Sequence, residues 1–293
     1  MLTVSDIPLT TQEFRLLREL IYRQTGIALR EGKNALLKTR LLKRLRRYGC
    51  DSFSQYYDLL QNQDVGGCEL QEMINAVTTN KTYFFREPHH FKCLEKLVLE
   101  RAKRLAAAGR QPSLRFWSAG CSSGEEAYSI AITLADALVP LSRWDVKVLA
   151  TDIDTQMLER GREAVYSGES VAELPHHLLE RHFLRGQGRY ADCVRVKPEL
   201  RSLVSFGRIN LAEEPWPLRG RFDAIFCRNV IIYFDRPTQQ TVLQRLARCL
   251  NAEGILFSGH SENLFWLSEL FQSVGNTAYQ VRTTSVTQPC LRA

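Results

Sequence analysis

The spacing of apolar residues divides the chain into two parts with different predicted secondary structure. Up to about residue 108 the apolar positions recur every three or four residues, which is typical of amphipathic helices. The pattern predicts helices at about 10–26, 33–48, 52–63, 68–77 and 89–108. Thr10 followed by Glu13 is typical of a capping box at the first helix, and Pro88 suits the first turn of the last one.

The second predicted helix has an apolar side and a separate basic side. The apolar side consists of Leu37, Leu41, Leu45 and Tyr48. The basic side consists of Arg40, Lys43, Arg44 and Arg47, at the i, i+3, i+4 and i+7 positions of a helix. Such a face is either a solvated surface or a binding surface, and the helical pattern alone leaves both open.

Beyond residue 110, short apolar runs alternate with amphipathic stretches, which indicates strands alternating with helices. The predicted strands are at about 114–118, 146–151, 222–228 and 254–259, and the predicted helices at about 124–138, 155–164 and 237–250. This alternation predicts an α/β fold with a doubly wound sheet. The segment joining the strands at 254–259 and 277–282 is short, so we expect the last strand to pair antiparallel.

The alternation breaks between about residues 168 and 206. A helix near 171–183 is followed by glycines and by two β-rich runs at 193–196 and 203–206. We expect a small antiparallel β-subdomain inserted in the sheet domain. The chain is thus predicted to divide into an all-helical N-terminal domain, residues 1–90, and a catalytic domain, residues 91–293.

Charge distinguishes the two parts further. Residues 1–50 hold eleven Lys and Arg residues against four Asp and Glu residues, a net charge of +7 that equals that of the whole 293-residue chain. A basic N-terminal part on a neutral body predicts an acidic partner. Eight scattered cysteines without C-x-x-C spacing, no signal peptide and no long apolar run indicate a cytoplasmic protein. The adjacent histidine pairs, 89–90 and 176–177, lack helical metal-site spacing, so we predict no metal and read them as surface or packing residues.

The loop "SAGCSSGEEAYS", residues 118–129, follows the first predicted strand and begins a helix. It lacks the Lys-Ser/Thr of a phosphate loop and has only Gly120 and Gly124 of a dinucleotide fingerprint. Glu125 and Glu126 would repel pyrophosphate but suit a cationic ligand with hydroxyl groups, such as S-adenosylmethionine. Asp152, at the end of the next strand, is placed to accept hydrogen bonds from ribose hydroxyls. Of the two glutamates, we expect Glu126 to contact the ligand and Glu125 to serve the helix N-terminus. Asp154 reads as a helix cap.

Four motifs along the chain resemble those of the CheR family of chemoreceptor glutamate methyltransferases. They read "TTNKTYFFREPHHF", "WSAGCSSGEEAYSIAI", "ATDID" and "FCRNVIIYFD". The resemblance implies a class I S-adenosylmethionine-dependent fold that methylates the γ-carboxyl group of glutamates on receptor cytoplasmic helices. The product of the cofactor would be S-adenosylhomocysteine. Lys81 and Tyr83 fill variable positions of the first motif.

The resemblance also implies roles for individual residues. Cofactor contacts are expected at Asn80, Thr82, Arg86, Glu126, Asp152, Asn210, Leu211, Arg228 and Asn229. Arg86 and Tyr233 are expected nearest the methyl transfer. The substrate carboxylate is ionised at neutral pH, so no general base is needed, and catalysis is expected to come from orientation.

Two partner sites follow from the same resemblance. The basic helix, with Arg40, Lys43, Arg44 and Arg47, is expected to dock acidic receptor helices. The segment from Arg185 to Val196 is similar to the loop with which receptor-tethered members bind a receptor C-terminal pentapeptide as an added strand. Asp192 stands where a further glycine is expected, which leaves tethering open.

Two other functions compete with this interpretation. A nucleic-acid methyltransferase would also use a basic part, but "CRNVIIYF" lacks the proline pair that DNA amino methylases carry at this place. A non-catalytic sensor that binds S-adenosylmethionine or a receptor tail would keep the same motifs. Methyl transfer to a receptor fragment distinguishes the three.

Overall fold

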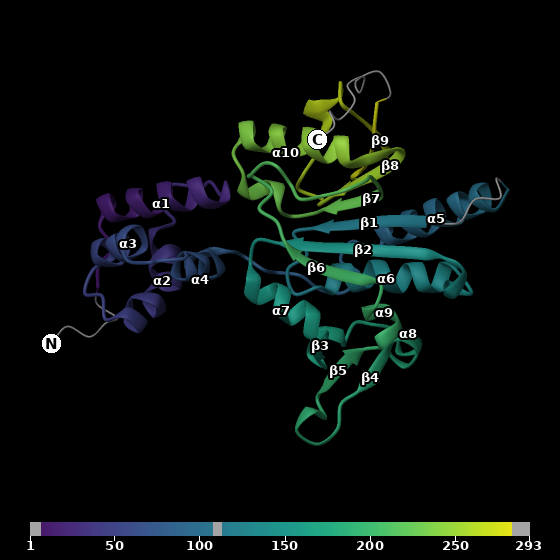
Figure 1. The fold of residues 1–293 in the computed structure, drawn as a ribbon, viewed down its shortest axis with the longest axis horizontal. Helices are drawn as coiled ribbons and strands as arrows, with labels where there is room; N and C mark the ends of the chain where they lie inside the picture. Colours follow the sequence, from purple (N-terminus) through teal and green to yellow (C-terminus); the bar gives the residue numbers. More distant parts are fainter. Residues whose placement is uncertain (1–6, 108–112, 283–293) are drawn as a thin grey trace.

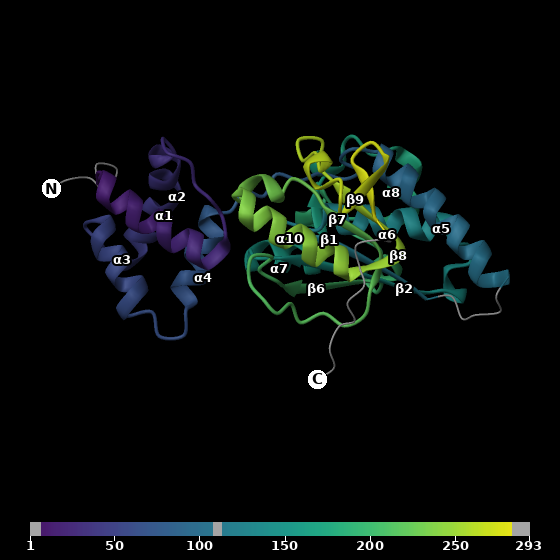
Figure 2. The same ribbon diagram turned by 90° about the horizontal axis from the view of Figure 1, so that it is seen from above.

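The computed structural model describes residues 7–107 and 113–282, and the first four helices form a unit beside the rest of the chain (Figures 1 and 2). We call this unit the helical module. It consists of α1 (Thr11–Thr25), α2 (Asn34–Tyr48), α3 (Phe53–Asn62) and α4 (Cys68–Val77). The four helices bury a core of their own, in which Leu17, Leu41 and Tyr56 are fully covered. Such a core forms because each helix has an apolar face, which the helices bury against one another.

The start of α1 and most of the apolar side of α2 are as predicted. Thr10 and Glu13 form a reciprocal capping box, with each backbone N–H donating to the other side chain at 2.9 and 3.2 Å. Leu37, Leu41 and Leu45 are buried. The prediction for Tyr48 was wrong, because this last residue of α2 is 43% exposed.

A seven-stranded sheet forms the second unit, in the order β6-β2-β1-β7-β8-β10-β9. Its strands are β1 (Ser113–Ala119), β2 (Asp145–Asp152), β6 (Val204–Arg208), β7 (Phe222–Cys227), β8 (Leu250–Ser258), β9 (Phe271–Gly275) and β10 (Ala278–Val281). The first five in this order are parallel, and β10 pairs antiparallel with β8. The predicted doubly wound sheet with an antiparallel last pair is confirmed.

Helices cover both faces of this sheet. One core contains residues of α5 (His89–Ala107), α6 (Glu125–Ala137) and α7 (Thr155–Glu163), and another contains residues of α10 (Arg236–Cys249). Neighbouring residues of β1 belong to different cores: Phe116 to the first and Trp117 to the second. This alternation follows from the two-residue period of a strand. The parallel strands then end together at one edge of the sheet, where the site lies.

A three-stranded antiparallel sheet, in the order β3-β5-β4, projects from the main sheet between α7 and β6 (Figure 1). It consists of β3 (Val165–Ser167), β4 (Phe183–Arg185) and β5 (Cys193–Val196), with α8 (His176–His182) beside it. The predicted inserted β-subdomain is confirmed.

Two details of the strand prediction were wrong. The run at 203–206 is not part of the insertion, because it belongs to β6, which pairs parallel with β2 after the short helix α9 (Pro198–Arg201). The edge strand β9 was missed: only Phe271 of its residues is buried, so its sequence has no apolar run. It follows β8 and pairs antiparallel with β10.

In the described part of the chain, no helix is both long enough and apolar enough to cross a membrane.

Candidate functional site

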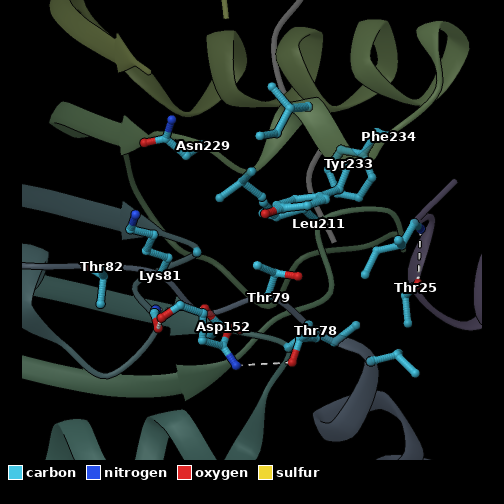
Figure 3. Close-up of a pocket in the computed structure, with 18 of the residues that line it drawn as sticks. Thr25, Thr78, Thr79, Lys81, Thr82, Asp152, Leu211, Asn229, Tyr233 and Phe234 are labelled. Carbon is cyan, nitrogen blue, oxygen red and sulfur yellow. Dashed lines mark hydrogen bonds between the residues drawn. The ribbon is translucent and has the colours of Figure 1, made fainter. Parts of the chain in front are cut away.

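A cavity of about 590 Å³ lies between the helical module and the carboxyl ends of β1, β2 and β7 (Figure 3). Its wall is formed by residues 25–40 of the module, by the segment 77–86 after α4, and by the loops that follow the strands. Ligands of doubly wound sheets bind at this edge. The wall includes all of the predicted cofactor contacts and Tyr233, namely Asn80, Thr82, Arg86, Glu126, Asp152, Asn210, Leu211, Arg228, Asn229 and Tyr233.

The loop after β1 requires its glycines. Gly120 has φ of +87°, and a Cβ atom there would lie 2.3 Å from a methyl group of Val230. Gly124 caps α6 with φ of +96°. Residues with a side chain rarely adopt such backbone angles, so the loop can take this path beside the cavity only because glycine occupies these two positions. Glu125 is buried as the first residue of α6 and accepts a hydrogen bond from Ser123 Oγ at 2.7 Å, away from the cavity wall.

Asp152 ends β2 and faces the cavity (Figure 3). Its Oδ2 accepts from the backbone N–H of Ser122 at 2.8 Å, and its Oδ1 accepts from that of Asp154 at 2.9 Å. Burial raises the pKa of this carboxyl group, although the two N–H donors act to lower it. Each carboxylate oxygen has a second lone pair, so Asp152 retains acceptors for the hydroxyl groups of a ligand.

Arg228, which is almost fully buried, joins two acidic side chains at the cavity wall. Its guanidinium lies 3.1 Å from Glu126 Oε2 and 3.2 Å from Glu87 Oε2, and it also donates to the carbonyl of Arg86. Ser118 Oγ donates to the other oxygen of Glu126 at 2.6 Å. Burial raises the pKa of Glu126, and Arg228 counteracts that rise. Glu126 therefore neutralises a buried arginine, a role that the sequence did not predict.

The first motif is tied to α7. Asp154 accepts from the backbone N–H groups of Gln156 and Met157 at 3.0 and 3.1 Å, so its predicted role as a helix cap is confirmed. Its Oδ2 also accepts from Thr78 Oγ1 and Asn80 Nδ2, both at 2.7 Å. The amide nitrogen of Asn80 is thus already used within the protein, and Asn80 holds the cavity wall to α7.

The two residues that flank Arg86 have left-handed backbone conformations. Phe85 and Glu87 have φ of 53° and 59°, which is uncommon for residues with side chains. The Arg86 guanidinium donates to the carbonyl of Lys81 at 2.9 Å and lies 5.7 Å from the centre of the Tyr83 ring. The chain around Arg86 is therefore bent back on itself, and Arg86 lines the cavity with one side-chain nitrogen bonded to its own motif.

Residues 229–235, which we call the Tyr233 turn, depend on an acid that the sequence analysis missed. Glu262 is 5% exposed and accepts from the backbone N–H groups of Asn229 and Gly259, both at 2.7 Å, and of Ile232 at 3.3 Å. Asn229 is left-handed, with φ of 59°, and its buried Oδ1 has no hydrogen-bond partner among the described residues. A ligand that donates a hydrogen bond would satisfy this atom. The sequence signal that could have identified Glu262 is its position as an acidic residue just after a buried strand.

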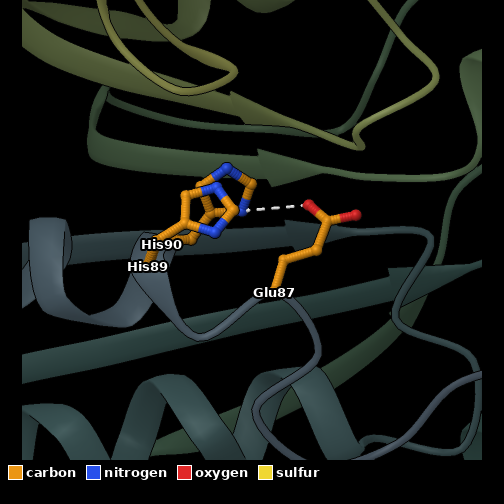
Figure 4. Close-up of side chains that lie close together, drawn as sticks. All are labelled: Glu87, His89 and His90. Carbon is orange, nitrogen blue, oxygen red and sulfur yellow. Dashed lines mark ion pairs between the residues drawn. The ribbon is translucent and has the colours of Figure 1, made fainter.

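Glu87, His89 and His90 lie together beside this site, with one polar atom of each within 4.8 Å of the others (Figure 4). His90 is fully buried, and its Nδ1 lies 3.4 Å from Glu87 Oε2. The same carboxylate oxygen is 3.2 Å from the guanidinium of Arg228. That positive charge neutralises Glu87 and opposes a cation, so we propose no metal here.

This cluster predicts a pH dependence of stability. Burial, and then the positive charge of Arg228, lower the pKa of His90 to about 3, against 6.5 for an unperturbed histidine. The unfolded chain therefore binds one more proton at this residue between these pH values, and the folded state loses stability as pH falls from 6.5 toward 3, by at most about 1.4 kcal/mol per pH unit.

In His90→Gln, the free energy of unfolding should decrease less steeply as pH falls from 6.5 toward 3. Urea denaturation at several pH values measures it, and His176→Gln, at a largely exposed histidine, is the control. If the pH profiles of the wild type and His90→Gln run parallel, His90 does not titrate in this way.

The four residues of the predicted docking face do not share one role. Arg40 lines the cavity and donates to Thr78 O and Thr79 Oγ1, both at 2.8 Å. Arg44 forms ion pairs with Glu69 and Glu72 inside the helical module, and the pair with Glu69 is buried. Lys43 and Arg47 are exposed and form no ion pair with any described residue. The free basic surface is thus smaller than the pattern predicted, because α4 places acids against α2.

Comparisons with known proteins match nearly the whole chain. Residues 12–78 match the all-alpha domain of CheR methyltransferase, and residues 80–280 match the SAM binding domain of CheR methyltransferase. Chemotaxis protein methyltransferase 2 of Pseudomonas aeruginosa is 47% identical over 270 residues, which is 92% of this chain and 93% of that protein. The chemotaxis protein methyltransferase of Salmonella typhimurium is 45% identical over 275 residues (93% and 91%), and that of Escherichia coli 44% over 274 residues (93% and 92%).

Proposed function

Because this chain belongs to the CheR methyltransferase family, an S-adenosylmethionine-dependent family, we propose that it methylates the γ-carboxylate of glutamates on chemoreceptor cytoplasmic helices. The products would be glutamyl methyl esters and S-adenosylhomocysteine, and the esters would serve chemotaxis adaptation. One observation carries this proposal: the ten residues expected around the cofactor and the methyl transfer all line one cavity. The enzyme would act in the cytoplasm, where these receptor helices lie.

The cavity fits S-adenosylmethionine, which when bound supplies a methyl group activated by its sulfonium. Asp152 would accept from the ribose hydroxyls, and Asn229 Oδ1 would accept from a donor of the same ligand. Arg86 would bind the cofactor carboxylate. Asn80 and Asn210 would act through the backbone that they hold in place, because their side-chain nitrogens are bonded within the protein. Thr82, Leu211, Glu126 and Arg228 complete the proposed set of contacts.

Catalysis in this site would depend on orientation. A glutamate carboxylate has a reference pKa of about 4.3, so the nucleophile is ionised at neutral pH and needs no base. Tyr233 would hold the oxygen of the substrate glutamate in line with the methyl group. Arg86 would fix either the cofactor carboxylate or the incoming glutamate. Holding two reactants in the right geometry can lower the activation barrier by about 7–11 kcal/mol.

We propose that residues 1–90 present the receptor helix and that residues 91–293 carry out the transfer. Lys43 and Arg47 are the exposed members of the predicted basic face of α2 and would attract an acidic helix. Reversing both charges with Lys43→Glu and Arg47→Glu should raise the KM for a receptor fragment by about tenfold at low salt, and less at high salt, because exposed charges are screened. The kcat should stay unchanged.

The pair Lys92→Glu and Lys96→Glu is a matched control for this prediction. These two lysines have the same spacing on α5 and are also exposed, so the net charge changes equally. Equal effects of the two pairs on KM would show that only net charge matters and would contradict docking on α2.

The inserted three-stranded sheet is the proposed site for a receptor C-terminal pentapeptide. β4 and β3 are its two edges, and a peptide could add to either as a further strand. Gly186 supports the bend of the connecting loop, since a Cβ atom there would lie 1.8 Å from the carbonyl oxygen of Tyr190. Calorimetric titration with an aromatic-containing pentapeptide tests this, with a chain lacking residues 186–192 as control.

The proposed reaction is tested with labelled S-adenosylmethionine and a purified receptor cytoplasmic fragment. We expect alkali-labile label on glutamates, and none on a fragment in which the methylated glutamates are replaced by glutamine. Cofactor binding without transfer to any receptor fragment would favour the sensor. Label on RNA or DNA instead would favour the nucleic-acid methyltransferase.

A further inference from the structure

The end of the first helix touches the Tyr233 turn directly. We call residues 22–28 the α1 exit segment. The backbone N–H of Ala28 donates to the carbonyl oxygen of Tyr233 at 2.8 Å. Ile27 and Phe234 form an isolated antiparallel bridge. The backbone of the proposed catalytic tyrosine is therefore paired with a backbone from the helical module.

Two further bonds extend this contact on either side. Tyr22 Oη donates to Asp235 Oδ2 at 2.8 Å, and Asp235 is the residue that caps α10. Asn210 Nδ2 donates to the carbonyl oxygen of Gln24 at 2.8 Å. The α1 exit segment thus holds both the turn that carries Tyr233 and the loop that carries Asn210, and both line the cavity.

Gly26 lets this segment approach so closely. It is the left-handed cap of α1, with φ of +73°. A Cβ atom there would lie 2.5 Å from the Cβ of Ala212 and 3.4 Å from the ring of Phe234. The glycine therefore meets both a backbone requirement and a packing requirement at the junction.

The Tyr233 turn has a second anchor on its other side. Glu262, from the segment after β8, accepts from the backbone N–H groups of Asn229 and Ile232. One end of the turn is thus fixed within the catalytic part of the chain, and the other end is fixed by the helical module. Any movement of the module relative to the sheet would move the carbonyl of Tyr233.

We propose that the α1 exit segment is a positioning element of the active site, which orients Tyr233 for methyl transfer as well as linking the substrate-docking module to the sheet. Tyr22, Gly26 and Ala28 are its positioning residues. They act through the Tyr233 turn: Tyr22 and Gly26 are not among the residues that line the cavity, and Ala28 lines it and donates its backbone N–H to the carbonyl of Tyr233. This inference rests on the proposed function for the role of Tyr233, but the contact itself does not.

Gly26→Ala tests the proposal. Alanine disfavours the left-handed φ and would collide with Ala212, so the turn should shift. Since small misplacements of reacting groups cost up to about 100-fold in rate, we expect kcat to fall about 10- to 100-fold while the KM for a receptor fragment changes little. Gly49→Ala is the matched control, because Gly49 caps α2 with φ of +64° and has open space around it.

Two more variants make the result specific. Ala212→Gly added to Gly26→Ala removes the collision but not the φ cost, so it should restore part of the lost kcat. Tyr22→Phe removes only the exposed hydrogen bond to Asp235 and should leave the fold intact. It should lower kcat by a smaller factor than Gly26→Ala does. If Gly26→Ala and Gly49→Ala alter kcat equally, or if Ala212→Gly restores nothing, the proposal is overturned.

Hydrogen exchange separates this proposal from the proposed function. The N–H groups of Tyr233 and Phe234 are bonded within the turn. We expect faster exchange there in Gly26→Ala and unchanged exchange in Gly49→Ala, whatever the substrate. If the wild type transfers no methyl group to any receptor fragment, the proposed function fails. Independently of that result, equal exchange of the Tyr233 and Phe234 amides in Gly26→Ala and Gly49→Ala would overturn the positioning role.

Discussion

Replacing Arg228 with methionine is expected to lower the free energy of unfolding by about 3–5 kcal/mol. The Arg228 side chain is 1% exposed, and its guanidinium is the only group within ion-pair distance of both Glu87 and Glu126 among the described residues. Without it, Glu87 and Glu126 lose the one positively charged side chain that both contact. Urea denaturation followed by circular dichroism measures the change.

Two further variants show whether the loss of stability comes from the unpaired acids. Adding Glu126→Gln to Arg228→Met removes one of the acids, so part of the lost stability should return. Arg18→Met is the control, because Arg18 forms an exposed ion pair with Glu31 at 3.9 Å, worth less than about 1 kcal/mol. If Arg228→Met destabilised the protein no more than Arg18→Met does, the buried network would not hold the site together.

Asp152→Asn is expected to raise the dissociation constant of S-adenosylhomocysteine by about 10- to 100-fold. A hydrogen bond to a charged group contributes about 1.5–3 kcal/mol, and each 1.4 kcal/mol is a factor of ten. The asparagine amide would also point a donor at the backbone N–H of either Ser122 or Asp154, so the loop after β1 would lose part of its support. Isothermal titration calorimetry measures the constant directly.

Asp145→Asn provides the control on the same strand. Asp145 begins β2, whereas Asp152 ends it, and its side chain pairs with Arg115 at the opposite edge of the sheet. This variant should bind S-adenosylhomocysteine as the wild type does. Equal weakening by the two variants would mean that the carboxylate of Asp152 makes no specific contact with the ligand.

The parts of the fold that sequence could predict are those with strong local signals. Five of the six residues of β7 are apolar, so "FDAIFC" is recognisable as a buried strand despite Asp223. The capping box of Thr10 and Glu13 marks the start of α1. The site could be predicted in outline because loops after neighbouring parallel strands meet at one edge. This brings Gly120, Asp152 and Arg228 to the same cavity.

What the sequence could not predict are contacts between distant segments. Glu69 pairs with Arg44 because α4 packs against α2, and nothing in the pattern of α2 indicates this acid. Glu262 holds amides of the Tyr233 turn, and Ala28 donates to Tyr233 itself. Such contacts depend on how the units pack, which hydrophobic periodicity does not encode.

One cavity, closed on one side by the helical module, is expected to hold the methyl donor. A crystal structure of the protein with S-adenosylhomocysteine tests it most directly. We expect the ribose hydroxyls within hydrogen-bond distance of Asp152, and the sulfur facing the side where Arg86 and Tyr233 line the cavity. Ligand density at any other place, with this cavity empty at a saturating concentration, would show that the cavity is not the cofactor site.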